Sequence, residues 1–307
     1  MNNENFMGLG GFLWFSGVVE DRQDPLKTGR LRIRILGHHT ENKNILPTAD
    51  LPWALCVLPI TASGVSGIGS SATGLLEGSW VFGFFRDGTY RQEPIILGSL
   101  PGRPIQYGRP DKGFNDPNIR PNKTLRDGEI VDKENDTDVP VSVYPRNINE
   151  PDVNRLAVND VNKPHPSLAI DAANRVTGIQ AYNSEWSQPQ STYAAVYPFN
   201  HVYESESGHI VEFDDTTDAE RIHIRHRTGT RTEITASGDQ LAIVKGNNTI
   251  IIDNDNKVYI KGNSDITVQG NAYIRAASDI GLLAGGNIDI TASGNITMVA
   301  SKIDLNP

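Results

Sequence analysis

The chain has 307 residues, of which 37% are hydrophobic and 21% charged, a composition that excludes collagen-like sequence and wholesale disorder. Lys and Arg number 28 against 37 Asp and Glu, so the net charge of −9 disfavours nucleic acid as a partner. The single cysteine, Cys56, excludes an intrachain disulfide and a cysteine-based zinc site, and its apolar neighbours indicate a small buried hydrophobe. We find no secretory signal and no run of ~18 apolar residues, so we expect a soluble protein.

The N-terminal third reads as a small β-barrel. Its five strand-like runs, separated by turn signals, cover residues 12–20, 30–36, 53–58, 79–86 and 94–100. In the second run Arg30, Arg32 and Arg34 alternate with Leu and Ile, which predicts a strand with one buried and one solvated face. Five strands in about 90 residues are typical of an OB-fold. Residues 1–105 carry nine basic and nine acidic side chains, so this domain favours docking to a protein over binding an oligonucleotide.

The middle of the chain, residues 106–200, is rich in proline and asparagine. It contains ten of the 18 prolines, whereas residues 199–306 contain none. Proline removes a donor from a β-ladder, so the middle segment is predicted to be mostly an extended linker that wraps on other surfaces, and the tail a β structure. The only helix expected in the linker is a short one around residues 167–176. The linker does not fit a compact enzyme domain.

The C-terminal segment contains an eight-residue repeat. From residue 238 the chain reads as octads, numbered here one (238–245) to eight (294–301), with Gly first in six of them and Asn or Asp second in all eight. Gly, Asn and Asp form tight corners at low steric cost, so a corner is predicted every eight residues. The predicted corner residues are Gly238, Asp239, Gly246, Asn247, Asp255, Gly262, Asn263, Gly270, Asn271, Asp279, Gly286, Asn287, Gly294 and Asn295.

Positions five and seven of each octad are apolar and lie on the same side of a strand. The predicted core residues are Ile250, Ile252, Val258, Ile260, Ile266, Val268, Ile274, Ile290 and Met298. One short strand buries little, and a single-chain β-helix needs around 20 residues for each turn. Three chains that each contribute one strand to every layer of a triangular prism satisfy both constraints. The sequence therefore predicts a homotrimer whose residues 201–307 form an intertwined triple-stranded β-helix, the needle. Its eight stacked octads together would be roughly 40 Å long.

These segments, in this order, resemble a known family. Residues 14–39 (WFSGVVEDRQDPLKTGRLRIRILGHH), 51–69, 77–88 (EGSWVFGFFRDG) and 95–102 resemble the OB-fold of the central spike proteins of contractile-tail phage baseplates. Residues 193–234 resemble the segment that leads into the triple-stranded β-helix of the same proteins. The resemblance implies an all-β chain with a hub-docking OB-fold, a linker and a needle.

The resemblance departs at the linker. Some spike proteins of this family carry a lysozyme domain between barrel and needle, but residues 106–200 lack the corresponding E-x8-D-x5-T arrangement and have too little helix for it. The densest acidic cluster, Glu204, Glu206, Glu212, Asp214 and Asp215, alternates with other residues and is interpreted as a solvated strand face. No catalytic residue is therefore assigned, and the protein is not expected to be an enzyme.

No metal or cofactor site is predicted either. Some members of the family end in histidines from three chains that hold an iron ion, but the segment after Ala300 has no histidine. His223 and His226 are interpreted as surface residues at the start of the needle. The octads differ in period from the nine-residue calcium-binding repeat, which disfavours calcium.

The function implied by the resemblance is mechanical. We expect a spike at the centre of the tail baseplate of the virion, whose OB-folds dock on a trimeric hub protein at the end of the tail tube. Sheath contraction would drive it through the host outer membrane, and a conical tip protein would cap the end at residues 305–307. Three alternatives remain: the spike of a type VI secretion or extracellular contractile injection system, a trimeric polysaccharide-degrading tailspike, and an OB-fold nucleic-acid binder.

Overall fold

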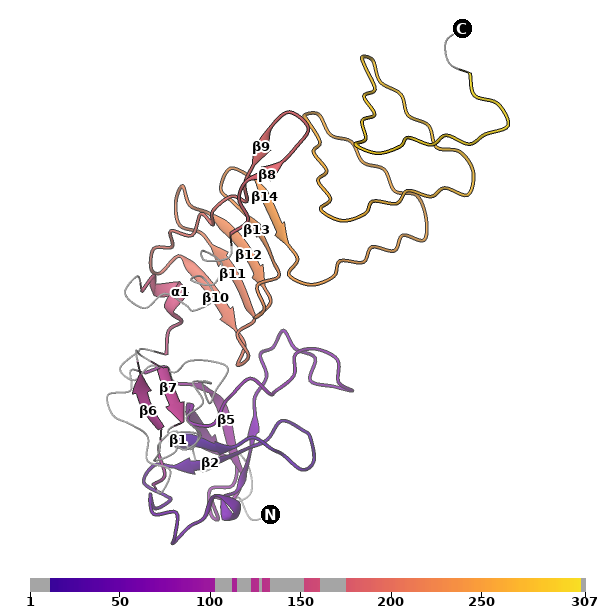
Figure 1. The fold of residues 1–307 in the computed structure, drawn as a ribbon. Coiled ribbons are helices and arrows are strands. Elements are labelled where there is room, and N and C mark those ends of the chain that lie inside the picture. Colours follow the sequence, from indigo (N-terminus) through magenta and orange to yellow (C-terminus); the bar gives the residue numbers. More distant parts are fainter. Residues whose placement is uncertain are drawn as a thin grey trace. The chain divides into compact units, whose positions relative to one another are not determined.

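The computed structural model describes residues 12–102, 112–114, 123–126, 129–132, 152–160 and 175–304. β-strands make up nearly all of the regular structure (Figure 1), as the sequence predicted. The chain divides into two compact units, of which the second consists of Gly178–Trp186 and Val258–Pro307 and the first of the remaining residues up to Lys257. In the described ranges we find no helix that is both long and apolar enough to cross a bilayer.

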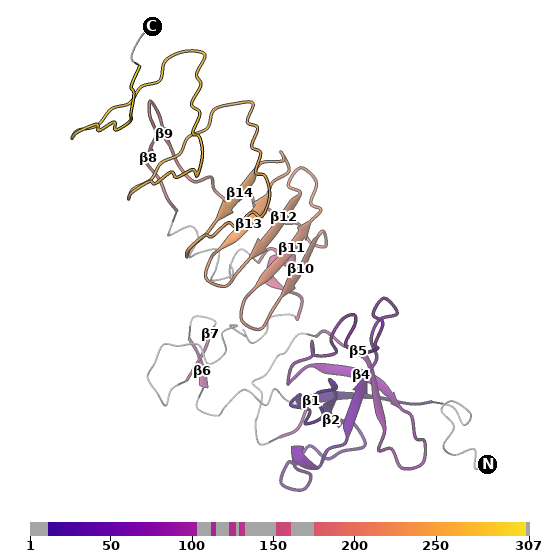
Figure 2. The same ribbon diagram turned by 90° about the vertical axis from the view of Figure 1, so that its right-hand side faces the viewer.

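Five strands close into an N-terminal barrel, which confirms the predicted OB-type architecture (Figure 2). Neighbouring strands around the barrel follow the order β1-β2-β3-β5-β4, and only the β3–β5 pair is parallel. Each strand lies within one residue of a predicted run at its start and within two at its end. The strands are β1 (Leu13–Asp21), β2 (Leu31–Ile35), β3 (Trp53–Cys56), β4 (Trp80–Phe85) and β5 (Pro94–Ser99), with a short 3-10 helix, η2 (Thr48–Asp50), before β3.

Alternate side chains of these strands fill the barrel interior. The core consists of Phe15, Val19, Leu31, Ile33, Ile35, Ala54, Val81, Phe85 and Ile96. Gly83 in β4 allows the closest approach, because a Cβ there would collide with the carbonyl oxygen of Ile95. Cys56 packs partly buried against the core, and this burial raises the pKa of its thiol. The core is thus built by the period-two pattern of the sequence.

The prediction that the arginine side chains of β2 form a solvated face is wrong for Arg34. Its side chain is fully buried, and its Nε donates to Oε1 of Glu20 at 2.7 Å. Its Nη1 and Nη2 donate to the carbonyl oxygens of Thr40 at 2.6 Å and Leu46 at 2.8 Å. The loop between β2 and β3 therefore closes over this side chain and satisfies it with a carboxylate and main-chain acceptors. The sequence pattern alone does not reveal that covering loop.

Replacing Arg34 with lysine should lower the free energy of unfolding of the barrel by about 2 kcal/mol. Lysine keeps the charge but cannot reach Glu20 and both carbonyls with one ammonium group. Urea unfolding of the full chain, followed by tryptophan fluorescence, measures this change because Trp14, Trp53 and Trp80 belong to the barrel.

The matched control for this prediction is Arg86→Lys. Arg86 pairs with Glu93 at 2.7 Å, but the two side chains are 46% and 50% exposed. Exposed pairs contribute little, so this change should cost less than about 0.5 kcal/mol. Equal effects of the two substitutions would contradict the importance of the buried guanidinium.

A second, five-stranded antiparallel sheet follows in order β10-β11-β12-β13-β14 (Figure 1). Each strand pairs antiparallel with the next one in the sequence, and a short turn connects the two. The last strand lies in octad one and pairs with β13, so this octad is part of the sheet. The strands are β10 (Asn200–Glu204), β11 (Ile210–Asp214), β12 (Arg221–Arg225), β13 (Arg231–Ile234) and β14 (Gln240–Ile243).

The segment between barrel and sheet contains short elements that sequence reasoning missed. Asn154 caps the short helix α1 by accepting a hydrogen bond from the Leu156 amide at 2.8 Å, and Asn159 ends it with a φ of 49°. The helix predicted around residues 167–176 lies almost wholly outside the described residues, and Arg175 and Val176 are not helical. The elements are β6 (Lys123–Arg126), β7 (Glu129–Asp132), α1 (Arg155–Val158), β8 (Ile179–Gln180) and β9 (Glu185–Trp186).

Candidate assembly surfaces

One face of the β10–β14 sheet carries a buried cluster of charged side chains. Oε1 of Glu212 accepts from Nη2 of Arg221 at 2.8 Å, and its Oε2 lies 2.6 Å from Nδ1 of His223. Nη1 of Arg221 also donates to Oε2 of Glu233 at 3.2 Å, and Asn200 donates to Glu212 at 3.0 Å. Arg221 thus bridges two carboxylates that are both removed from solvent.

The pKa of Glu212 is lowered by this environment. Burial by itself opposes ionisation and raises the pKa, but the hydrogen bond from His223, the positive charge of Arg221 and the hydrogen bond from Asn200 together outweigh it. Glu212 is therefore held as a carboxylate whose charge is neutralised within the sheet. A carboxylate in this state has no free proton to donate, which makes it unsuited to general acid catalysis.

An extended strap, residues 188–195, covers the charged cluster. Ser191 donates to Glu233 at 2.7 Å, and the ring of Tyr193 lies over the guanidinium of Arg221, 4.9 Å from its centroid. The Tyr193 hydroxyl donates to the main-chain oxygen of Leu156 in α1 at 2.7 Å. Burial raises the pKa of Tyr193. The strap and α1 together form a lid of main chain and polar side chains over the face.

The buried cluster corrects two sequence-based interpretations. Glu212 and Asp214 are not on a solvated strand face, and His223 is not a surface residue, since all three are buried. The strap, which is remote in sequence from β11 and β12, excludes water from them. The alternation of charged and apolar residues in β12 (RIHIR) and β13 (RTEI) indicates two strands with unlike faces. It does not indicate which of the two faces another segment covers.

The opposite face of the sheet is apolar and exposed. Phe213 and Ile222 are directly opposite each other across β11 and β12, as are Val211 and Ile224. Phe213 is 53% exposed and Ile224 54%, although the charged residues on the other face are buried. Ile222 pairs in turn with Ile234 of β13, which continues the apolar rows across the sheet. Contiguous apolar surface of this kind marks an interaction site.

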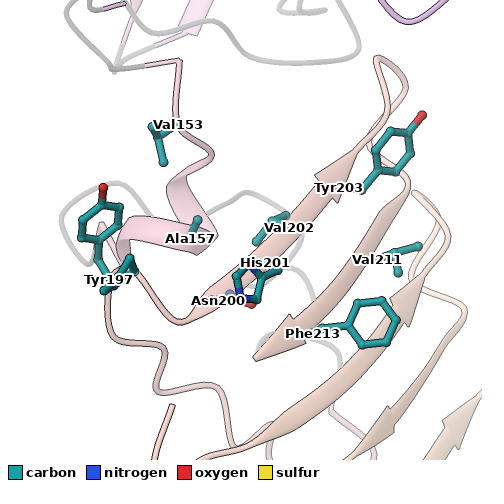
Figure 3. Close-up of a pocket in the computed structure, with 10 residues that line it drawn as sticks. Val153, Ala157, Tyr197, Asn200, His201, Val202, Tyr203, Val211 and Phe213 are labelled. Carbon is teal, nitrogen blue, oxygen red and sulfur yellow. The ribbon is translucent and has the colours of Figure 1, made fainter. Parts of the chain in front are cut away.

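A hollow of about 550 Å³ lies along β10, the edge strand of the sheet (Figure 3). Tyr197 and Ala157 line one side, and Tyr203, Val211 and Phe213 line the other. Its full lining contains no aspartate or glutamate among the described residues. The hollow therefore lacks the two carboxyl groups that glycoside hydrolysis requires, and within the described ranges no group of three potential metal ligands occurs.

The octads follow a path that bends at a regular interval. Bends occur at residues 245–246, 253–254, 261–262, 269–270, 277–278, 285–286 and 293–294, a period of eight residues. They lie at the eighth and first positions of the octads, next to the predicted corner residues. Among the predicted corner residues only Gly238 has a positive φ, of 84°. The described residues 244–304 contain no strand paired within the chain.

The predicted needle core residues are exposed in the single chain. At position seven, Ile252, Ile260 and Val268 are 48%, 51% and 50% exposed, whereas Tyr259 at position six is 85% exposed. Position five is also open, as Ile266 at 87% shows. The structure thus presents a long series of apolar side chains that the described part of this chain does not bury.

The hairpin formed by β8 and β9 contacts two octads. Its main-chain oxygen at Gln180 accepts from the hydroxyl of Thr267 in octad four at 2.9 Å, and its Tyr182 hydroxyl donates to Asp289 in octad seven at 2.9 Å. The two octads are three repeats apart, yet one hairpin reaches both. Octads four and seven are therefore both within reach of one hairpin, as a path that returned to the same side every three octads would place them.

A group of aromatic side chains lies on the outer surface of the barrel. The rings of Trp14 and Phe82 stack at 5.3 Å with an interplanar angle of 3°, and Phe12 packs edge-on against Phe84 at 4.9 Å. Trp14 is 48% exposed and Trp80, in β4, 39%. Exposed aromatic surface is enriched at protein interfaces, so this patch is a candidate docking site.

Comparisons with known proteins agree with this architecture. Residues 37–140 match the family model of the Gp5 N-terminal OB domain. Protein Gp5 of Vibrio phage KVP40 is 39% identical over 274 residues, which cover 79% of this chain and 60% of that protein. The pre-baseplate central spike protein Gp5 of Enterobacteria phage T4 is 44% identical over 111 residues, 34% of this chain and 19% of that protein. The chain thus spans less than two thirds of these relatives. It is similar to phage Gp5 central spike proteins, and the match to the Gp5 OB domain agrees with the OB-type architecture of its N-terminal barrel.

Proposed function

We propose that this chain forms the membrane-puncturing spike at the centre of a contractile phage tail baseplate. The name of the T4 relative, a pre-baseplate central spike protein, supports the location in the virion. The regular path of the octads supports the mechanical role, because a stiff rod is what penetration of the host outer membrane on sheath contraction requires. In this proposal residues 1–105 form the OB-fold that docks on the baseplate hub, residues 106–200 form the linker between barrel and needle, and residues 201–307 form the needle.

The needle is proposed to be a homotrimer. The observation that carries this proposal is the contact of one hairpin with octads four and seven, which supports a path in which each chain returns to the same side every three octads. Three copies interleaved along that path place positions five and seven on the common axis. Each copy then contributes ~25 cal/mol for every Å² of apolar surface that it buries there. Main-chain hydrogen bonds between copies would satisfy the strand edges of every layer.

The barrel is proposed to bind a trimeric hub protein at the end of the tail tube. The exposed aromatic patch around Trp14 and Phe82 supports a protein partner, and the balance of nine basic and nine acidic residues in 1–105 argues against nucleic acid. At the other end, the conical tip protein that we expect would cover the strand edges of the last octads. Penetration is proposed to be mechanical, without hydrolysis of peptidoglycan or polysaccharide.

The native mass of the full chain tests the trimer directly. Light scattering should give three times the mass of one chain, and the species should survive SDS without heating, because interwoven strands separate only by unwinding. A mass of one chain would overturn the proposal. A turbidity assay on cell walls and a reducing-sugar assay on polysaccharide should both show no activity; activity in either would identify a lytic spike or a degrading tailspike.

A further inference from the structure

We propose that the β8–β9 hairpin of each chain (Gly178–Trp186) lies across octad five of one neighbouring copy and octad six of the other, and thereby holds the three chains in register. This inference rests on the proposed trimer. It assigns the hairpin a partner, the outer surface of two other copies of this chain.

The contacts of the hairpin place it on the outside of the needle. Thr267 occupies position six of octad four and Asp289 position four of octad seven. Both positions are on the strand face opposite to positions five and seven, because side chains alternate along a strand. If positions five and seven face the axis, the side chains that meet the hairpin face outward. The hairpin is therefore an external element and does not compete with the core.

The reach of the hairpin fits a gap of several strands. Gln180 and Tyr182 are two residues apart, which is ~7 Å along a strand, and the tyrosine side chain extends this reach to its hydroxyl. In a three-chain needle, octads four and seven of one chain are three strand spacings apart, or ~14 Å. In a single-chain coil they would be adjacent, at ~5 Å. A pair of contacts from a backbone carbonyl and a distant hydroxyl matches the wider interval.

Three-fold symmetry identifies what fills this gap. When one chain moves to the next side with each octad, the other two chains do the same, rotated by one and two sides. On the side that carries octads four and seven of one chain, the two layers between them belong to octad five of one copy and octad six of the other. The hairpin that touches octads four and seven must pass over these two strands.

The side chains in those layers complement the hairpin. Position six of octad five is Arg275, which is exposed, and the hairpin carries one carboxylate, Glu185, which is also exposed. Position six of octad six is Leu283, an outward apolar residue that is 101% exposed in the single chain. The side chain of Tyr182, which is 76% exposed and reaches toward octad seven, offers apolar ring area to cover it. Both a charge pair and an apolar contact are thus available between copies.

A disulfide experiment on the full chain tests this arrangement. In a Cys56→Ser background, Glu185→Cys combined with Arg275→Cys should form disulfides between copies on mild oxidation. Each hairpin then links to the next copy around the ring, so most of the protein should run as a covalent trimer after boiling without reductant, and as a single chain with reductant.

The controls separate this inference from the trimer itself. Each single-cysteine variant should remain a single chain after boiling, and Glu185→Cys with Ile251→Cys should cross-link far less, because octad two lies two layers below octad four. A native trimer that gives single chains after boiling, either without a cross-link or with a disulfide inside each chain, would overturn the hairpin inference and leave the trimer standing. A native single chain before oxidation would overturn both.

Discussion

The substitution Ile260→Asp should abolish the trimer. Ile260 is at position seven of octad three, so in the proposed needle three copies of this side chain meet around the axis in one layer. Aspartate would place three carboxylates there without partners. The free energy needed to bury even one unpaired charge exceeds the stabilisation that the apolar contacts of one layer provide. Light scattering should give the mass of one chain for the variant, and the unheated protein should migrate in SDS as a single chain.

The adjacent residue provides the control. Tyr259 belongs to the same octad but is at position six, 85% exposed against 51% for Ile260. Tyr259→Asp adds the same charge on the outer face, where its effect on stability should stay within about 0.5 kcal/mol. A trimer that survives Ile260→Asp but not Tyr259→Asp would show that the two faces have been assigned the wrong way round.

The apolar face of the β10–β14 sheet extends this argument to the base of the needle. Phe213, Ile222 and Ile224 are open on one face of the sheet, while the strap and α1 cover the other. A sheet with one protected and one open apolar face is suited to form one wall of a closed assembly, with the open faces turned inward. The covered charged face would then be the outer wall of each copy.

The parts of the fold that the sequence predicts are those encoded by short-range patterns. The barrel strands follow from apolar alternation between turn residues, as in Leu31, Ile33 and Ile35, and their burial confirms it. The octads follow from a repeat of Gly and Asn or Asp, and the bends have the same period of eight. In both cases the information lies within a window of about ten residues.

The parts that could not be predicted depend on distant segments. Arg34 is buried because the loop before β3 folds over it, and Glu212 and His223 because the strap does. Ser191 and Glu233 are 42 residues apart, and Tyr182 and Asp289 are 107. Alternating charged and apolar residues indicate a strand but do not tell which face another segment covers. The burial of charge therefore emerged only from the three-dimensional arrangement.

The buried cluster leads to the second prediction with a large expected effect. Arg221→Met should lower the local free energy of opening of the sheet by about 3–5 kcal/mol, because it leaves the carboxylates of Glu212 and Glu233 buried without their shared partner. Methionine keeps most of the volume, so the effect reports charge and not a cavity. Hydrogen exchange of the β11–β13 amides measures local opening even when the rest of the assembly stays folded.

Two further variants separate the causes. Arg227→Met alters an exposed arginine in the turn after β12 and should change exchange by less than about 0.5 kcal/mol. Adding Glu212→Gln and Glu233→Gln to Arg221→Met removes the two buried carboxylate charges that have lost Arg221 as their partner. This triple variant should recover much of the lost protection against hydrogen exchange. Failure of this recovery would mean that the guanidinium acts through packing against Tyr193 and not through the carboxylates.

The same cluster predicts an acid dependence with a defined sign. The pKa of Glu212 in the folded state is below its ordinary value of 4.5, so the carboxylate contributes stability at neutral pH. This contribution is lost as the pH falls from about that value through the lowered one, since the unfolded chain takes up the proton first. Exchange of the β11–β13 amides should accelerate over this range in the natural sequence, and this acceleration should be weaker in Glu212→Gln. An equal response in the two proteins would place the acid-sensitive group elsewhere and would contradict the closure of the strap over an ionised Glu212.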